Sequence, residues 1–348
     1  MTAADRLSGP LADVAGDAGH RDHPPRVGFF TDTSVCIGCK ACEVACKEWN
    51  AVPADGLDLL GMSMDNTGGL GADTWRHVAF VEQPRRLGAQ DAGLDTLPTG
   101  PSGVAGAAAV VASRLHAAPR GGSELGTGPL SGGRVQDLGM PSSTRPGDVP
   151  GAAARADLRW LMASDVCKHC THAACLDVCP TGSIFRTEFG TVVVQQEICN
   201  GCGYCVSACP YGVIDRRPDD GRAQKCTLCY DRLHDGMEPA CAKACPTQSI
   251  QFGELDGLRE RAARRVEELH ERGIPEARLY GHDPADGVGG AGSVFLLLDR
   301  PEVYGLPPDP VVPTRDAPRM WRRAALAAAG FLAAGVGAFL PAGPGAGS

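Results

Sequence analysis

The sequence predicts an α+β fold of two nested, cysteine-rich units, with a Gly/Ala-rich insertion and a single C-terminal transmembrane helix. Three observations predict this architecture. The 16 cysteines fall in four short runs of related spacing. A short segment repeats after the fourth cysteine of three of these runs. Near the C-terminus, residues 324–340 carry no charged side chain.

The central run shows what the spacing means. It reads Cys199-Asn-Gly-Cys202-Gly-Tyr-Cys205-Val-Ser-Ala-Cys209-Pro210. Three cysteines at steps of three, then a fourth cysteine followed by proline, are typical of a cubane [4Fe–4S] cluster. Three thiolates on one tight loop can hold three irons, and Gly201 and Gly203 let the backbone wrap closely around them. The fourth cysteine lies too far round the loop and usually ligates a neighbouring cluster.

Three further runs follow related patterns. They comprise Cys36, Cys39, Cys42 and Cys46; Cys167, Cys170, Cys175 and Cys179; and Cys226, Cys229, Cys241 and Cys245. Together with the central run they use all 16 cysteines, which predicts four cubanes of four ligands each.

Two other uses of cysteine fit the pattern less well. Disulfides fit badly, because paired cysteines only three positions apart do not bridge easily. Structural zinc fits better, but zinc sites combine two such pairs and need neither a third cysteine nor a fourth before proline. Aromatic residues make up 5% of the chain, so clusters would replace part of an apolar core. The net charge of −8 argues against a nucleic-acid partner.

The spacing also predicts which cysteines share a cluster. The second and third runs lie close in sequence, so they should exchange their fourth cysteines, and the first and fourth runs then pair around them. The predicted ligand sets are Cys36, Cys39, Cys42 and Cys245 (site 1); Cys226, Cys229, Cys241 and Cys46 (site 2); Cys167, Cys170, Cys175 and Cys209 (site 3); and Cys199, Cys202, Cys205 and Cys179 (site 4).

Local patterns predict the supporting elements. Strands are expected at 27–30, 75–81 and 294–298, a hairpin at 183–194 and a helix over 255–272, followed by an extended proline-rich run over 301–318. An isoleucine five residues after the fourth cysteine, at Ile184, Ile214 and Ile250, should cover a cluster.

These patterns divide the chain into five parts. They are a disordered leader (1–27), an outer unit (28–84 plus 216–310), a low-complexity insertion (85–155), an inner unit (156–215) and a membrane anchor (311–348) with its span at about 324–340. The insertion has no cysteine and no Phe, Tyr or Trp, so it cannot bury enough apolar surface to offset its ordering entropy.

No residues form a recognisable catalytic site, phosphate loop or dinucleotide fingerprint. His169 is interpreted as a loop residue on the solvent side. The alternative is that His169 is a polar neighbour of a cluster and tunes its potential. Lys40 and Lys47 are expected to offset cluster charge. The sequence predicts several clusters and one membrane anchor, and it shows no recognisable substrate pocket. This combination indicates a protein that conducts electrons. A scaffold stabilised by structural metal is the competing class.

The residues also carry a family resemblance. Cys36-Ile-Gly-Cys-Lys-Ala-Cys-Glu-Val-Ala-Cys-Lys-Glu-Trp-Asn50 and Lys225-Cys-Thr-Leu-Cys-Tyr-Asp-Arg232 resemble iron–sulfur beta subunits of membrane-bound molybdenum or tungsten oxidoreductases. The tail, through Tyr304-Gly-Leu-Pro-Pro-Asp-Pro310 to the final helix, is similar to the beta subunit of respiratory formate dehydrogenase. Related subunits serve hydrogenases and nitrate, dimethyl sulfoxide and polysulfide reductases, so formate is the less specific part of the resemblance.

The resemblance implies the same nesting of the clusters and the same partners. A molybdopterin alpha subunit would oxidise formate, and a cytochrome b gamma subunit would pass electrons to quinone. It also implies a cell-membrane protein with its cluster domain on the outer face. Four arginines precede the predicted span, and by the positive-inside rule they favour the cytoplasmic face instead.

Overall fold

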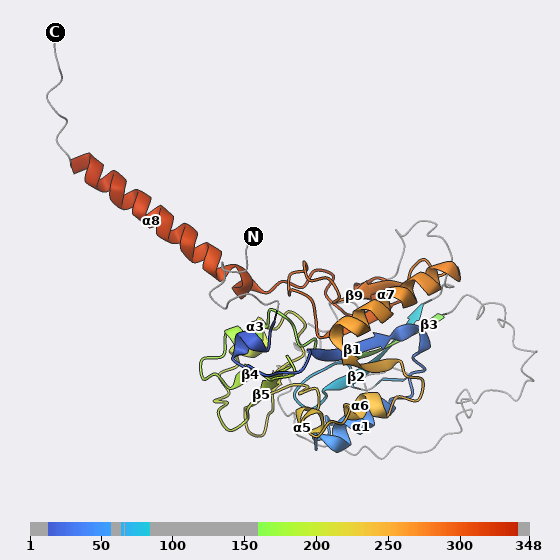
Figure 1. The fold of residues 1–348 in the computed structure, drawn as a ribbon. Helices are drawn as coiled ribbons and strands as arrows, with labels where there is room; N and C mark the ends of the chain where they lie inside the picture. The colour runs from blue at the N-terminus through green and yellow to red at the C-terminus, as the bar shows by residue number, and fades with distance from the viewer. Residues whose placement is uncertain (1–12, 57–63, 66, 84–158, 340–348) are drawn as a thin grey trace, which may run out of the picture.

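The computed structural model describes residues 13–56, 64–65, 67–83 and 159–339 (Figure 1). These ranges include all 16 cysteines. The predicted insertion, 85–155, lies outside the described residues, and so do 1–12 and 340–348.

A four-stranded sheet joins one strand from the early part of the sequence to three strands from its later part. Its order is β8 (Ile250–Glu254), β1 (Val27–Asp32), β10 (Ser293–Leu297) and β9 (Arg278–Tyr280). β1 pairs parallel with β10 and antiparallel with β8, while β10 pairs antiparallel with β9. The predicted strands at 27–30 and 294–298 are therefore confirmed. Because the N-terminal strand lies between two C-terminal strands, the segment with the first run folds together with the segment that follows the fourth.

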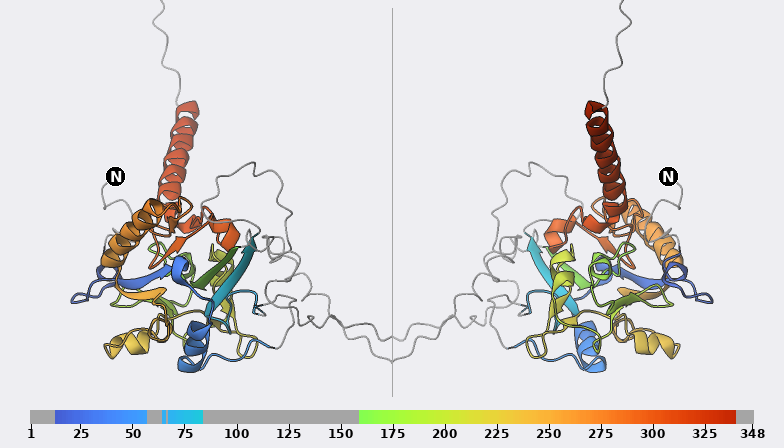
Figure 2. Two further views of the ribbon diagram at one scale, coloured as in Figure 1. Left: turned by 90° about the vertical axis from the view of Figure 1, so that its right-hand side faces the viewer. Right: turned by 90° about the vertical axis from the view of Figure 1, so that its left-hand side faces the viewer.

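One long helix covers this sheet. α7 (Leu255–Glu271) packs along β1 and β10 (Figures 1 and 2). Leu255, Leu258, Ala262 and Leu269 recur at helical spacing and are buried against the strands, as the sequence predicts. Gly273 follows the helix with φ +79°, a left-handed conformation that favours glycine.

A second pair of strands flanks the predicted insertion in the sequence. β2 (Arg76–Gln83) pairs antiparallel with β3 (Arg159–Val166), and Gln83 lies directly opposite Arg159. The Arg159 guanidinium donates to the Gln83 side chain at 2.8 Å. The chain therefore leaves the paired strands at 83 and returns to them at 159, at the same end of the ladder.

The remaining elements are short and surround the cysteine runs. They are α1 (Ala41–Trp49), α3 (Ala174–Asp177), β4 (Ile184–Arg186), β5 (Val192–Val194), α4 (Tyr204–Ala208), β6 (Asp215–Arg216), β7 (Ala223–Gln224), α5 (Tyr230–His234) and α6 (Ala240–Lys243). β4 and β5 pair antiparallel and confirm the predicted hairpin, with Gly190 at φ +71° in its turn. β6 and β7 form a second small ladder.

Two sequence expectations need correction. Residues 13–27 fall within the expected disordered leader, yet Val14 and Ala15 are buried, next to the 3₁₀ helix η2 (Gly16–Ala18). The proline-rich run is not wholly extended, because it contains η5 (Pro301–Tyr304) and η6 (Pro313–Asp316). Proline suits the first turn of a helix, where its missing N–H costs no hydrogen bond. A further 3₁₀ helix, η3 (Thr33–Val35), leads from β1 to the first cysteine run.

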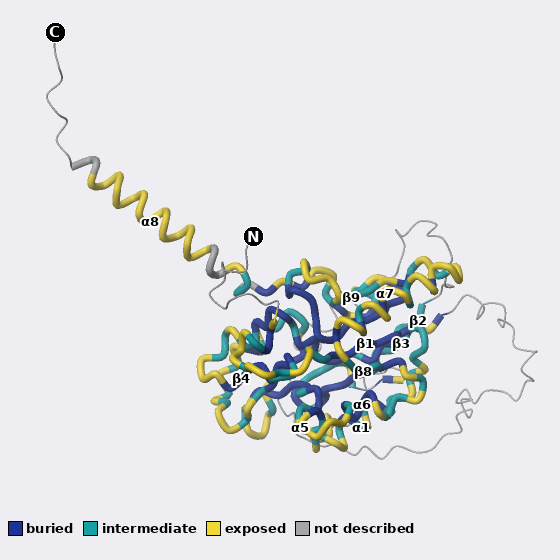
Figure 3. Tube along the Cα trace, viewed as in Figure 1, coloured by how far each residue is buried: buried dark blue, intermediate teal, exposed yellow. Residues whose placement is uncertain are grey.

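The last helix projects from the body of the protein. α8 (Ala317–Phe339) extends away from the sheet, and its described side chains are exposed (Figures 1 and 3). Within the described part of the chain, no helix combines the length and the apolar character needed to cross a membrane. The structure therefore does not support the predicted transmembrane span over 324–340. Many residues of α8 are alanine, with a small side chain, or glycine, with none, and Arg322 and Arg323 lie in its early turns.

Candidate metal centres

All four cysteine loops share one backbone device. The residue just before the second cysteine has a positive φ in each run: Gly38 (+65°), His169 (+44°), Gly201 (+72°) and Leu228 (+59°). A left-handed residue at this point reverses the chain tightly, so that the flanking thiols face the same side of the loop. Two of the four are not glycine, which is uncommon and indicates that the surrounding structure fixes the loop.

A second shared device follows the fourth cysteine of three runs. The residue three positions later has a positive φ in each, at Gly182 (+67°), Gly212 (+63°) and Gln248 (+54°). The turn precedes by two residues the isoleucine that the repeated segment contains. Ile184, Ile214 and Ile250 are all buried, and the last two line cysteine cavities, as the repeated segment predicts.

Site 1 is brought together around a cavity. Its walls include Cys36, Cys39 and Cys42 of the first run and Cys245 of the fourth. Ser164, from β3, lies with its hydroxyl oxygen 3.2 Å from the Cys42 sulfur. Ile250 and Val78 complete the apolar side of the cavity. Three thiols of one run and the last thiol of a distant run thus face one space.

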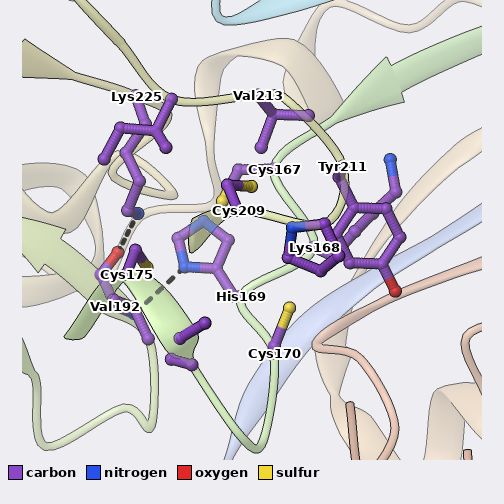
Figure 4. Close-up of a pocket in the computed structure, with 14 residues that line it drawn as sticks. Cys167, Lys168, His169, Cys170, Cys175, Val192, Cys209, Tyr211, Val213 and Lys225 are labelled. Atoms are coloured by element: carbon purple, nitrogen blue, oxygen red, sulfur yellow. Dashed lines mark hydrogen bonds between the residues drawn. The ribbon is translucent and has the colours of Figure 1, made fainter. Parts of the chain in front are cut away.

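Site 3 surrounds a second cavity (Figure 4). The cavity is lined by Cys167, Cys170 and Cys175 of the second run and Cys209 of the third. Its wall also contains His169 and two buried lysines, Lys168 and Lys225. The fourth cysteine again comes from the partner run, within the inner unit.

Within site 2 and within site 4, the predicted ligand cysteines also lie near one another. The Cys46 thiol interacts electrostatically with those of Cys226, Cys241 and Cys229. The Asn50 amide lies between two of them, 3.8 Å from the Cys46 sulfur and 3.7 Å from that of Cys229. In site 4, the Cys205 thiol interacts with those of Cys199, Cys202 and Cys179.

Electrostatic interactions between thiols of different sites connect the four sites in series, which we call the line of sites. Cys42 of site 1 interacts electrostatically with Cys241 of site 2. Cys226 of site 2 interacts with Cys167 of site 3. Cys175 of site 3 interacts with Cys205 of site 4. The order of the thiol sets is therefore 1, 2, 3, 4.

The two ends of this line reach the surface, whereas site 2 does not. Cys39 of site 1 and Cys202 of site 4 are exposed, while all four thiols of site 2 are buried. An electron on site 2 would be shielded from water, and one on either end site would be close to a docked partner.

The donor sets suit iron–sulfur clusters. Burial raises the pKa of Cys42 to about 11, that of Cys205 to about 11 and that of Cys175 to about 12. Such thiols need a bound cation to stay deprotonated. Among the described residues, no three His, Cys, Asp or Glu side chains lie close enough to hold a single metal ion. In sites 1 and 3 the thiols surround a cavity, as ligands of a multi-iron group do.

Buried cations lie among the sites. Arg76, from β2, donates through Nη2 to the Cys241 sulfur at 3.2 Å and through Nη1 to the Ser164 carbonyl oxygen at 3.1 Å. Lys225 donates to the Cys226 carbonyl oxygen at 2.9 Å and to that of Val192. These groups can balance the negative charge of thiolate-bound clusters.

The two lysines that the sequence predicts to offset cluster charge are paired with carboxylates. Lys47 forms an ion pair with Asp55 at 2.7 Å, and Lys40 pairs with Asp65 at 3.3 Å, although Lys40 also lines the site 1 cavity. The sequence carried a signal for the buried lysines, since Lys168 and Lys225 adjoin the first cysteines of their runs. It carried none for Arg76, which lies outside every run.

His169 is not the solvent-side residue that the sequence suggested. It is 2% exposed and lines the site 3 cavity. Burial, together with the nearby Lys225, holds its pKa well below the ordinary value for histidine, so the ring is neutral. The alternative expectation, a neighbour of the cluster, agrees with this position.

Comparisons with known proteins agree with this geometry. A family described as a 4Fe-4S dicluster domain matches residues 158–255, and a 4Fe-4S binding domain matches residues 33–49. The nitrate-inducible formate dehydrogenase iron-sulfur subunit of Escherichia coli is 33% identical over 319 residues, which cover 90% of this chain and 83% of that protein. The chain belongs to the formate dehydrogenase iron–sulfur subunit family.

Other relatives extend the comparison. The formate dehydrogenase iron-sulfur subunit of Haemophilus influenzae is 33% identical over 336 residues, covering 93% of this chain and 83% of that protein. One subunit of the Escherichia coli anaerobic dimethyl sulfoxide reductase is 43% identical, but over 27% of this chain and 46% of its own length. The similarity to the formate dehydrogenase subunits thus spans far more of the chain.

Family membership fixes the general role of the protein. It is an iron–sulfur electron-transfer subunit with [4Fe–4S] clusters, and it is not itself the catalytic subunit. Relatives of this kind are subunits of oxidoreductase complexes, so a separate catalytic subunit is implied.

Proposed function

We propose that this chain holds four [4Fe–4S] clusters and conducts electrons from a formate-oxidising molybdenum or tungsten pterin subunit toward the membrane. The observation that carries the proposal is the line of four thiol sets, with exposed thiols at its two ends. The clusters supply one-electron chemistry when bound. The chain's own residues ligate them in the predicted sets, shield site 2 from water and place cations beside the buried thiolates.

The direction of transfer is part of the proposal. η6, at the start of α8, packs beside α3 of the inner unit, where the Thr314 hydroxyl donates to the Asp177 carboxylate at 2.6 Å. α8 therefore starts on the side of sites 3 and 4. We assign site 1, at the opposite end, to electron entry from the catalytic subunit, and site 4 to electron exit.

Attachment to the membrane is also proposed. α8 exposes Leu326, Phe331, Leu332 and Val336, and such side chains favour an apolar environment over water. In the complex they would lie against the membrane and a cytochrome b gamma subunit that reduces quinone, with the cluster domain on the outer face. Truncation after Asp316 should release the protein from membranes, and protease access in intact spheroplasts should decide the side.

The central test is metal content and reduction. The anaerobically purified chain should contain about sixteen iron atoms and as many acid-labile sulfides, as four cubanes require. The isolated chain should not oxidise formate, whereas formate should reduce its clusters when the pterin subunit is present. Zinc in place of iron would refute the cluster assignment. Reduction by another substrate's catalytic subunit, but not by a formate-oxidising one, would favour a related reductase or hydrogenase.

A further inference from the structure

The hydrogen bonds of His169 define which ring nitrogen carries the proton. The backbone N–H of Val192 donates to Nδ1 at 3.0 Å (Figure 4). Because Nδ1 accepts this bond it carries no proton, so the N–H of the imidazole lies on Nε2. Nε2 is buried and has no hydrogen-bond partner among the described residues. A buried donor without an acceptor is costly and indicates a missing partner.

The backbone of His169 is also held in place. The His169 carbonyl oxygen accepts a hydrogen bond from Arg26 Nη2 at 2.8 Å, and the Gly292 backbone N–H lies 3.3 Å from the same oxygen. The loop fixes φ at +44°. Figure 4 shows the ring among the labelled cysteines of site 3. The unpartnered N–H therefore belongs to a rigid group in the wall of a cluster cavity.

The two lysines in the same wall are engaged elsewhere. Lys168 Nζ donates to the Val166 carbonyl oxygen at 2.9 Å and pairs with Asp165. Lys225 Nζ donates to the carbonyl oxygens of Val192 and Cys226. Val192 thus orients both groups, since its N–H fixes the histidine and its carbonyl oxygen holds the lysine.

We propose that His169 Nε2–H donates a hydrogen bond to a sulfur atom of the cluster in site 3 and thereby favours its reduced form. The inference rests on the proposed function, because it needs a cluster at this site. Reduction adds one negative charge to the cluster, so an N–H donor stabilises the reduced state more than the oxidised one. His169 is a positioning and tuning residue and takes no part in ligation.

The chain itself offers the matched variant. Leu228 occupies the equivalent position in the fourth run with φ +59° and is buried, so leucine is compatible with this loop conformation. His169→Leu removes the donor. His169→Gln keeps an N–H donor on a side chain of similar reach. Both are made in the full-length chain within its complex and compared with the wild type.

The experiment is an EPR-monitored redox titration preceded by iron and sulfide analysis. In His169→Leu one of the four spectral components should titrate at a lower potential. A tenfold shift in its equilibrium toward the oxidised form corresponds to 59 mV for one electron. His169→Gln should recover a large part of the shift. The other three components act as internal controls and should not move.

A second readout covers the case in which His169→Leu loses its cluster. Pulsed EPR of the reduced wild type, labelled with ¹⁵N-histidine, should show a coupled nitrogen and one exchangeable proton on the same component. Four intact clusters with no shift in His169→Leu, or no histidine coupling in the wild type, would overturn the inference. Absence of four [4Fe–4S] clusters from the wild type would instead contradict the proposed function.

Discussion

Replacing Arg76 should disturb two clusters at once. Its guanidinium donates to the Cys241 sulfur in site 2, and it also lies 3.3 Å from the Ser164 hydroxyl, which contacts the Cys42 sulfur in site 1. The side chain is 1% exposed and stacks over the Phe29 ring at 4.8 Å. Although burial alone would lower the pKa of Arg76, the neighbouring thiolates of sites 1 and 2 raise it, so the positive charge is retained.

The size of the effect follows from this geometry. A unit charge about 5 Å from an added electron, at an effective dielectric constant of about 20, contributes about 3 kcal/mol. For one electron this corresponds to a potential on the order of 100 mV. Arg76→Met should therefore lower the potentials of the clusters in sites 1 and 2 by up to that amount. It should also destabilise the fold by about 3 kcal/mol, because the Ser164 carbonyl oxygen loses a charge-assisted hydrogen bond.

Redox titration of the complex by EPR measures both shifts. Arg76→Lys is the control, since it keeps the charge and loses the two-armed hydrogen bonding, and its shifts should be less than half as large. The components from sites 3 and 4 should stay in place. If all four clusters are present in Arg76→Met and no potential moves, Arg76 does not set these two potentials.

Three other predictions test the assembly of the sites. Cys245→Ser should alter a different EPR component from Cys226→Ser, because the two thiols are assigned to sites 1 and 2; a common component would refute the crossed pairing. Gly201→Ala should impair cluster assembly at site 4, since an added Cβ would lie 2.6 Å from the Gly221 carbonyl oxygen, whereas Gly212→Ala, with open space around it, is the milder control. Replacing 84–158 by an Asn-Gly turn should leave the iron content unchanged, and a fall in iron per chain would show that the segment supports a site.

The cysteine chemistry was readable from the sequence because ligand spacing is a local property. Loop length and the glycines fixed how three thiols of one run could face one cluster. The repeated segment after the fourth cysteine predicted the covering isoleucines, and all three are buried. Helical spacing placed α7, which buries one regular face, alternation placed β2, and two apolar segments around a glycine turn placed the β4–β5 hairpin.

Features that depend on distant contacts were not readable in this way. Arg76 reaches the sites because β2 and β3 pair across the predicted insertion, and nothing near it in sequence indicates a thiolate neighbour. His169 looked like a loop residue, because its burial depends on Arg26 and Gly292 from far along the chain. For α8, the absence of charge predicted a span, although its alanines and glycines make it only weakly apolar.

With the proposed nested pairing, folding and cluster binding would be coupled. The first run supplies three thiols to site 1, yet the cavity is closed by Cys245, which the chain reaches only after both inner runs. The same distant segments meet in the sheet, where β1 lies between β8 and β10. The strand contacts position the two halves of the site, and cluster binding would in turn fasten the strands together. Burial raises the pKa of the thiols, so without clusters they would be protonated. In that apo state neither metal bonds nor other cross-links would hold the cysteine runs in place.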